Sequence, residues 1–180
     1  MILFQHLVDN TVKKLRYQIA NLLTIINLGL GGFAIIFVIQ GQFGLSVTFI
    51  CLAAIFDRFD GMVARKMNIT SEIGKQLDSL CDIISFGVAP AILLYYSTLI
   101  EFGFAGAMFT IIFIACGAIR LARFNVSEQD GFFVGLPITA AGCILTISHL
   151  VNDFIESPVF MFIILTLSLL MISNFRIKKV

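Results

Sequence analysis

Charged residues are scarce in this sequence. Only 13% of its 180 residues are Asp, Glu, Lys or Arg, whereas soluble domains contain roughly a quarter. Hydrophobic residues make up 59% of the chain, and the mean hydropathy is +1.01. This excess argues against a soluble protein and indicates lipid-facing surface. We therefore expect residues 1–180 to form one all-α membrane domain.

The side chains used for thiol, zinc or nucleic-acid chemistry are also sparse. The four cysteines stand singly in apolar runs, without the short paired spacings of a metal site or a redox motif. The two histidines, His6 and His149, have no acidic or histidine partner at ligand spacing. A net charge of +1 does not suggest nucleic acid as a partner. We interpret the four cysteines as inert, buried side chains and the two histidines as lying outside any functional site.

Hydrophobic runs of membrane-spanning length are abundant. We predict six spans between residues 20 and 175, at 20–39, 45–62, 77–96, 104–120, 136–151 and 159–175. Residues 1–17 carry apolar side chains at spacings of three and four, which predicts an amphipathic helix in the membrane interface. A soluble cap packed on the bundle is the alternative for that segment. The expected fold is a six-helix membrane bundle with an N-terminal interfacial helix.

The basic residues predict the orientation of the spans. All 12 fall before the first span, around the connection between the second and third, at the end of the fourth, or at the C-terminus. Six spans place these four segments on one side, and Lys and Arg concentrate in cytoplasmic loops. We therefore expect both termini and the acidic stretch 57–82 on the cytoplasmic side, and we expect the membrane to be a prokaryotic cytoplasmic membrane.

The most informative stretch is residues 57–82. At about 100° per residue, one helical face carries Asp57, Asp60, Gly61 and Ala64. A face of the next helix carries Gly74, Asp78, Asp82 and Ser85. Clustered carboxylates near hydrocarbon need cations. A rim of salt bridges to neighbouring Lys and Arg would satisfy single acids, but two facing stripes favour a binding site.

Hard oxygen ligands without histidine favour Mg²⁺ or Mn²⁺, with Ca²⁺ also possible. Four carboxylates are enough for two ions, and such ions usually complete their shell with phosphate oxygens. Arg65 offers a fixed cation for the same phosphates, while Gly61 and Gly74 leave room for a bulky group. The stretch therefore predicts a site for two divalent cations and a phosphate-bearing substrate.

The spacing of these residues resembles the signature of the CDP-alcohol phosphatidyltransferase family, with every fixed position from Asp57 to Asp82 matched. This resemblance implies a six-helix enzyme, usually a homodimer, that transfers a phosphatidyl group from CDP-diacylglycerol to an alcohol and releases CMP. It implies metal binding by Asp57, Asp60, Asp78 and Asp82, with Asp82 also the general base. It further implies CDP-diacylglycerol contacts from Asn21, Thr24, Gly61, Ala64, Arg65 and Gly74.

Segments beyond this signature resemble the phosphatidylserine synthase branch, namely 21–24, 85–91, 120–125 and 135–137. L-serine carries a carboxylate, so its pocket needs a cation near the metals. The tentative acceptor residues are Arg120, Arg123, Asn125 and Ser85. Snorkelling of the two arginines to the membrane surface is the alternative.

Three other functions stay open. The same transfer to glycerol 3-phosphate, an inositol phosphate or choline would require a different acceptor pocket. A small divalent-cation transporter would also use intramembrane acids, although it should distribute them along the depth of several helices. A purely structural protein has no use for the acidic stripes.

Overall fold

The computed structural model describes residues 2–66, 72–126, 132–173 and 176–178. Its side chains are described for residues 18, 21–59, 61–62, 72–126 and 135–173. The long helices are α1 (Ile2–Ile39), α2 (Phe43–Lys66), α3 (Glu72–Asp82), α4 (Ala89–Ser97), α5 (Phe104–Val126), α6 (Ile138–Leu150) and α7 (Ser157–Ile172). A π-helix, η1 (Ile83–Val88), joins α3 to α4, and two short 3₁₀ helices are η2 (Leu99–Phe102) and η3 (Asn152–Phe154). The expected all-α class is confirmed.

Three helical segments of the described chain are long and apolar enough to cross a membrane. They are Asn21–Ile39, Glu72–Ser97 and Phe104–Val126. Helices α6 and α7 are apolar but shorter, and α2 has charged residues toward its end. The six-span topology therefore stays a prediction, while the three long apolar helices indicate an integral membrane protein.

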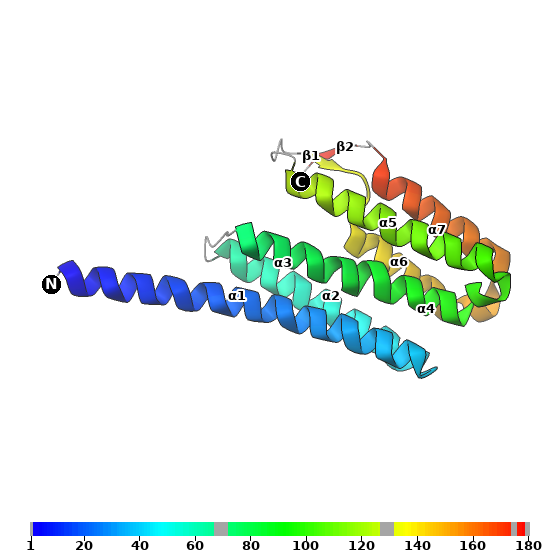
Figure 1. Cartoon of the computed structure of the whole chain (residues 1–180), viewed down its shortest axis with the longest axis horizontal. Helices are drawn as coiled ribbons and strands as arrows, with labels where there is room; N and C mark the ends of the chain where they lie inside the picture. The colour runs from blue at the N-terminus through cyan, green and yellow to red at the C-terminus, as the bar shows by residue number, and fades with distance from the viewer. Residues whose placement is uncertain (1, 67–71, 127–131, 174–175, 179–180) are drawn as a thin grey trace.

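Helix α1 continues without a break from residue 2 into the first predicted span. We expected a separate interfacial helix over residues 1–17, but the described helix has 38 residues from Ile2 to Ile39. At 1.5 Å per residue it is roughly 57 Å long, which exceeds the ~40–45 Å thickness of a whole bilayer. Figure 1 shows its N-terminal part projecting beyond the bundle. An interfacial position for this part remains a prediction.

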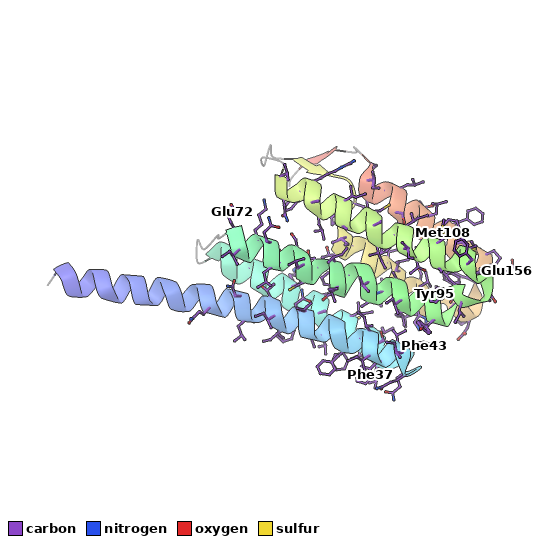
Figure 2. The ribbon with its side chains drawn as sticks, viewed as in Figure 1. Phe37, Phe43, Glu72, Tyr95, Met108 and Glu156 are labelled. Carbon is purple, nitrogen blue, oxygen red and sulfur yellow. The ribbon has the colours of Figure 1, made fainter. Side chains whose placement is uncertain are left out.

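The tight connections lie at one end of the bundle. Gly41, between α1 and α2, and Gly103, between η2 and α5, have φ values of 73° and 54°, a backbone region that glycine adopts readily. In Figure 1 the α4–α5 and α6–α7 connections lie at the right, whereas the end of α5 and the C-terminus lie toward the left. Figure 2 likewise shows Glu72 and Glu156 at opposite ends. The basic segments thus gather toward one end.

A short β-ribbon is a departure from the expected all-helical chain. Strands β1 (Phe132–Val134) and β2 (Arg176–Lys178) pair in antiparallel register, with Phe133 opposite Ile177. The amide of Leu136 then donates to the carbonyl of Leu170, 3.1 Å away. The segment that leads into α6 is therefore bonded to the end of α7. Three-residue strands carry too little alternation to be recognised from sequence.

The core lies where η1, α5, α6 and α7 meet. Phe86, Phe113 and Phe160 are fully buried there. Close packing of α6 on η1 depends on Gly142, because a Cβ at this position would lie 2.9 Å from the Cα of Phe86. Large apolar side chains elsewhere are exposed, among them Ile111 and Phe162. Such exposed surface suits contact with lipid.

Candidate active site

Three of the four predicted acids converge in the structure. Asp57 comes from α2, and Asp78 and Asp82 come from α3, one helical turn apart. Each offers a carboxylate oxygen, and these oxygens all lie within 4.8 Å of one another. All three side chains are half-buried. The helical phase of residues 57–82 therefore predicted this convergence correctly for Asp57, Asp78 and Asp82.

The spacing of these oxygens fits a hard cation. Oxygens on opposite sides of one ion lie about 4.2 Å apart for Mg²⁺ and about 4.6–5.2 Å apart for Ca²⁺, given metal–oxygen distances of about 2.1 and 2.3–2.6 Å. Three half-buried carboxylates at this separation also repel one another unless a cation or protons neutralise them. The cluster can therefore hold a divalent ion, and its geometry does not select which one.

The remaining predicted positions on α2 are partly outside the described side chains. The helix carries Asp60, Ala64 and Arg65, and their side chains lie outside the described residues. Gly61 is described and lines the same cavity as the three acids. The predicted roles of Asp60, Ala64 and Arg65 thus rest on the sequence.

Helix α1 packs on both α2 and α3, whereas the described parts of α2 and α3 make few close backbone contacts with each other. Their acids lie close together in the lining of a cavity of about 770 Å³. Its described lining comes from α2, α3, α5 and α6 with the residue before α6: Ala54, Asp57, Arg58, Gly61, Met62, Asp78, Ser79, Asp82, Arg120, Leu121, Phe124, Pro137, Ile138, Thr139, Ala140 and Cys143.

Arg120 on α5 lines this cavity and is buried. Only 9% of the residue is exposed, which argues against the snorkelling alternative. Its Nε atom is buried and has no hydrogen-bond partner among the described residues. A buried guanidinium is costly unless it is paired. Asp82 in the same cavity interacts with it electrostatically, and its burial there also suits an anionic ligand.

Arg123 has a different position, although it lies only one turn further along α5. Its side chain is exposed, and Nη1 donates to the backbone carbonyl of Ile172, 3.1 Å away. Ile172 is the last residue of α7, where carbonyls lack partners within the helix. Arg123 thus caps α7, and it is not among the described residues that line the cavity.

Asn125 connects α5 to α3. Its amide donates to the Ser79 hydroxyl at 2.9 Å and to Oε1 of Gln76 at 3.3 Å, while the Ser79 hydroxyl lies 3.2 Å from Oδ1. Lys75 donates to the backbone carbonyl of Asn125, 2.9 Å away, and lies over the ring of Phe124. The amide expected at the acceptor instead fastens α5 to the helix that carries Asp78 and Asp82.

Asn125→Ala should lower the stability of the protein by about 1–2 kcal/mol, because it removes side-chain hydrogen bonds that are only part-buried. Thermal unfolding in detergent would measure the change. Asn152→Ala, in η3, is the matched control and should shift the midpoint less. An unchanged midpoint for Asn125→Ala would show that this connection contributes nothing.

Ser85 does not share the cavity with Asp82. It is fully buried, and its hydroxyl donates to the backbone carbonyl of Asn27 on α1, 3.1 Å away. The π-helix η1 begins directly after Asp82, and its wider turns end the 100° phase on which the predicted face depends. Asn21, Thr24 and Gly74 are likewise not among the described lining residues.

Sequence reasoning missed Ser79 and Thr139, which line the cavity beside the predicted residues. Ser79 directly follows Asp78, and this adjacency to a predicted metal ligand is a signal that could have identified it. Thr139 lies in the first turn of α6, just after Gly135 and Pro137. Only the folding of α6 onto the cavity brings Thr139 there, and no local pattern signals that contact.

Fold and site together define a class of protein: an all-α membrane protein with an acidic cavity suited to divalent cations. The model of the family described as CDP-alcohol phosphatidyltransferase matches residues 17–174. The chain belongs to this family, as the spacing from Asp57 to Asp82 indicated.

Curated relatives cover most of the chain. A CDP-diacylglycerol–serine O-phosphatidyltransferase of Helicobacter pylori is 37% identical over 169 residues, which span 89% of this chain and 71% of the relative. An archaetidylserine synthase of Methanothermobacter thermautotrophicus is 38% identical, over 89% of this chain and 69% of the relative. A CDP-diacylglycerol–serine O-phosphatidyltransferase of Methanocaldococcus jannaschii is 42% identical, over 74% of this chain and 64% of the relative.

Proposed function

We propose that this chain transfers the phosphatidyl group of CDP-diacylglycerol to the hydroxyl of L-serine, which yields phosphatidylserine and CMP. The observation that carries this proposal is the shared cavity, in which the carboxylates of Asp57, Asp78 and Asp82 face the same space as the buried Arg120. Family membership supports the donor. The names of the similar proteins support serine as the acceptor.

Asp57, Asp60, Asp78 and Asp82 would hold two divalent cations, Mg²⁺ or Mn²⁺. Such cations, when bound, neutralise the diphosphate and stabilise charge on the oxygen that leaves. Asp82 accepts the proton of the serine hydroxyl as this oxygen attacks the β-phosphorus. The bond between that phosphorus and the CMP oxygen breaks, and CMP leaves. Arg65 binds phosphate oxygens and keeps the donor in line for attack.

The two substrates occupy different parts of the site. Gly61, Ala64 and Gly74 leave space for cytidine beside α2 and α3, with Asn21 and Thr24 contributing from α1. The acyl chains remain in the bilayer, because moving them into a polar cavity would expose them to water. Arg120 pairs with the serine carboxylate. Arg123, Asn125 and Ser85 hold the surrounding helices instead, given their contacts.

The proposed topology has six spans, an N-terminal interfacial segment over residues 1–17, and one domain over residues 1–180. Both termini and the acidic cavity lie on the cytoplasmic side, where serine and CDP-diacylglycerol are both available. Toward this end of the bundle lie the basic ends of α5 and the C-terminal strand. We further propose a homodimer, as the family resemblance implies.

Purified protein should release CMP and form phosphatidylserine when it receives CDP-diacylglycerol, L-serine and Mg²⁺ or Mn²⁺. Parallel reactions with glycerol 3-phosphate, inositol phosphate or choline should yield little lipid product. Excess EDTA should stop the reaction, and added Mg²⁺ or Mn²⁺ should restore it, because the carboxylates need a cation to hold the diphosphate. Thin-layer chromatography and mass spectrometry of the lipid identify the product.

The same experiment separates the alternatives. Product with only a non-serine alcohol would leave the family assignment intact and overturn serine as the acceptor. Metal uptake by proteoliposomes in the absence of nucleotide, together with no transfer to any alcohol, would favour a cation transporter instead.

A further inference from the structure

We propose that the N-terminus of α6, together with Arg120, forms a subsite for the carboxylate of the acceptor. This inference rests on the proposed function, and it assigns to the first turn of α6 a role in substrate recognition. The subsite consists of the backbone amides of Ile138, Thr139 and Ala140 and the guanidinium of Arg120. All four residues line the cavity that also contains the acids.

The first turn of α6 offers hydrogen-bond donors for which the described residues supply no partner. Pro137 is the N-cap residue, with φ −56° and ψ 139°, and its carbonyl accepts the amide of Ala141 at 3.0 Å. The amides of residues 138–140 therefore precede the first hydrogen bond within the helix. No side chain of the N-cap residue satisfies them. A helix end of this kind attracts anions through its amides and its dipole.

Arg120 is the second, independent observation. Its side chain comes from α5, is more than nine-tenths buried, and has an Nε without a partner among the described residues. A buried guanidinium in the same cavity as a helix N-terminus adds a full positive charge to the partial charge of the helix. Two different elements thus contribute positive potential to the same cavity.

The charges of the cavity match a zwitterionic acceptor. The lining combines acids from α2 and α3 with Arg120 from α5 and the start of α6, and Asp82 interacts electrostatically with Arg120. An amino acid can direct its carboxylate to Arg120 and the start of α6, and its hydroxyl and ammonium groups toward the acids. A phosphate of the lipid donor has the same anionic chemistry, so the experiment has to distinguish the two sources.

The test places a competing carboxylate in the subsite. Thr139→Asp adds a negative charge at the second helical position of α6, where it can accept from the same amides. We expect KM for L-serine to rise by about tenfold or more, because a charge-assisted hydrogen bond is replaced by repulsion. KM for CDP-diacylglycerol should change by less than about twofold, since the donor phosphates bind elsewhere.

Two further variants control for charge and for folding. Gly44→Asp puts the same residue at the second position of α2, where a Cβ meets no atom within 4 Å and the side chain is exposed. It should leave both KM values unchanged. Thr139→Val removes the hydroxyl but keeps the amides, so its effect on KM for serine should be smaller than that of Thr139→Asp. All three proteins should unfold no more than a few degrees below the unsubstituted protein.

Acceptor analogues provide a test that needs no substitution. L-serinamide and serinol lack the carboxylate, and we expect them to react with a kcat/KM about 10²-fold lower than that of L-serine. In Thr139→Asp this preference should fall below about tenfold. If serine reacts but the analogues react equally well, the subsite is wrong while the proposed function stands. If Thr139→Asp raises KM for CDP-diacylglycerol instead, the helix end binds donor phosphate. If serine itself fails, the proposed function fails.

Discussion

Asp82→Asn should abolish CMP release, with a loss of about 10³-fold or more, while the protein still folds. A positioned general base contributes roughly 10²–10⁴-fold, and this carboxylate also belongs to the cluster whose oxygens lie within 4.8 Å of one another. Asparagine has nearly the same shape but cannot accept the serine proton. The measurement is CMP release from CDP-diacylglycerol and L-serine, with thermal unfolding as the test of folding.

Asp153→Asn is the matched control for this substitution. Asp153 is exposed in η3, in the connection between α6 and α7, and its replacement should leave turnover unchanged. Normal turnover in Asp82→Asn would rule out its role as the base. Loss of turnover together with loss of folding would point to a structural role instead.

Gly142→Ala should destabilise the protein by about 1–3 kcal/mol or more, which is the usual cost of overpacking a core. The added methyl group would collide with the carbonyl oxygen of Phe86, and the Cα of the same residue would lie 2.9 Å away. These are backbone atoms of η1, so relief requires α6 to move away from the helix that follows Asp82. We expect a lower unfolding midpoint and reduced CMP release.

Gly29→Ala is the comparison for the loss of a helical glycine. Gly29 lies on α1 with nothing within 4 Å of a Cβ, and it is exposed. Alanine is a better helix former by up to about 1 kcal/mol, so this variant should be as stable as the unsubstituted protein or more so. If Gly142→Ala unfolds no earlier than Gly29→Ala, the contact between α6 and η1 is looser than the structure indicates.

The sequence predicted best where helical phase alone sets position. Asp57 lies on one helix and Asp78 and Asp82 on the next, and their spacing was sufficient to foresee that the three converge. The need for a cation beside the serine carboxylate also led to Arg120, although it led equally to Arg123. The helical class followed from composition, since lipid leaves few ways to satisfy backbone hydrogen bonds.

Contacts between distant segments were beyond the reach of local patterns. Arg120, Arg123 and Asn125 looked alike as acceptor residues, yet one lines the cavity, one caps α7 and one bonds to Ser79. Ser85 depended on a helical phase that η1 interrupts. Arg123 and Asn125 owe their roles to carbonyl and hydroxyl groups more than 40 residues away in sequence, which periodicity cannot reveal.

Because α2 and α3 make little contact, a cation bound between them would also affect the stability of the folded bundle. The described parts of both helices pack on α1 and make few close backbone contacts with each other, so the carboxylates of Asp57, Asp78 and Asp82 lie where little else joins α2 to α3. Without a counterion, repulsion between these carboxylates disfavours the close approach of α2 and α3. A cation that binds only the folded arrangement stabilises it in proportion to the logarithm of its concentration. A divalent cation held by these three carboxylates would thus also stabilise the contact between α2 and α3.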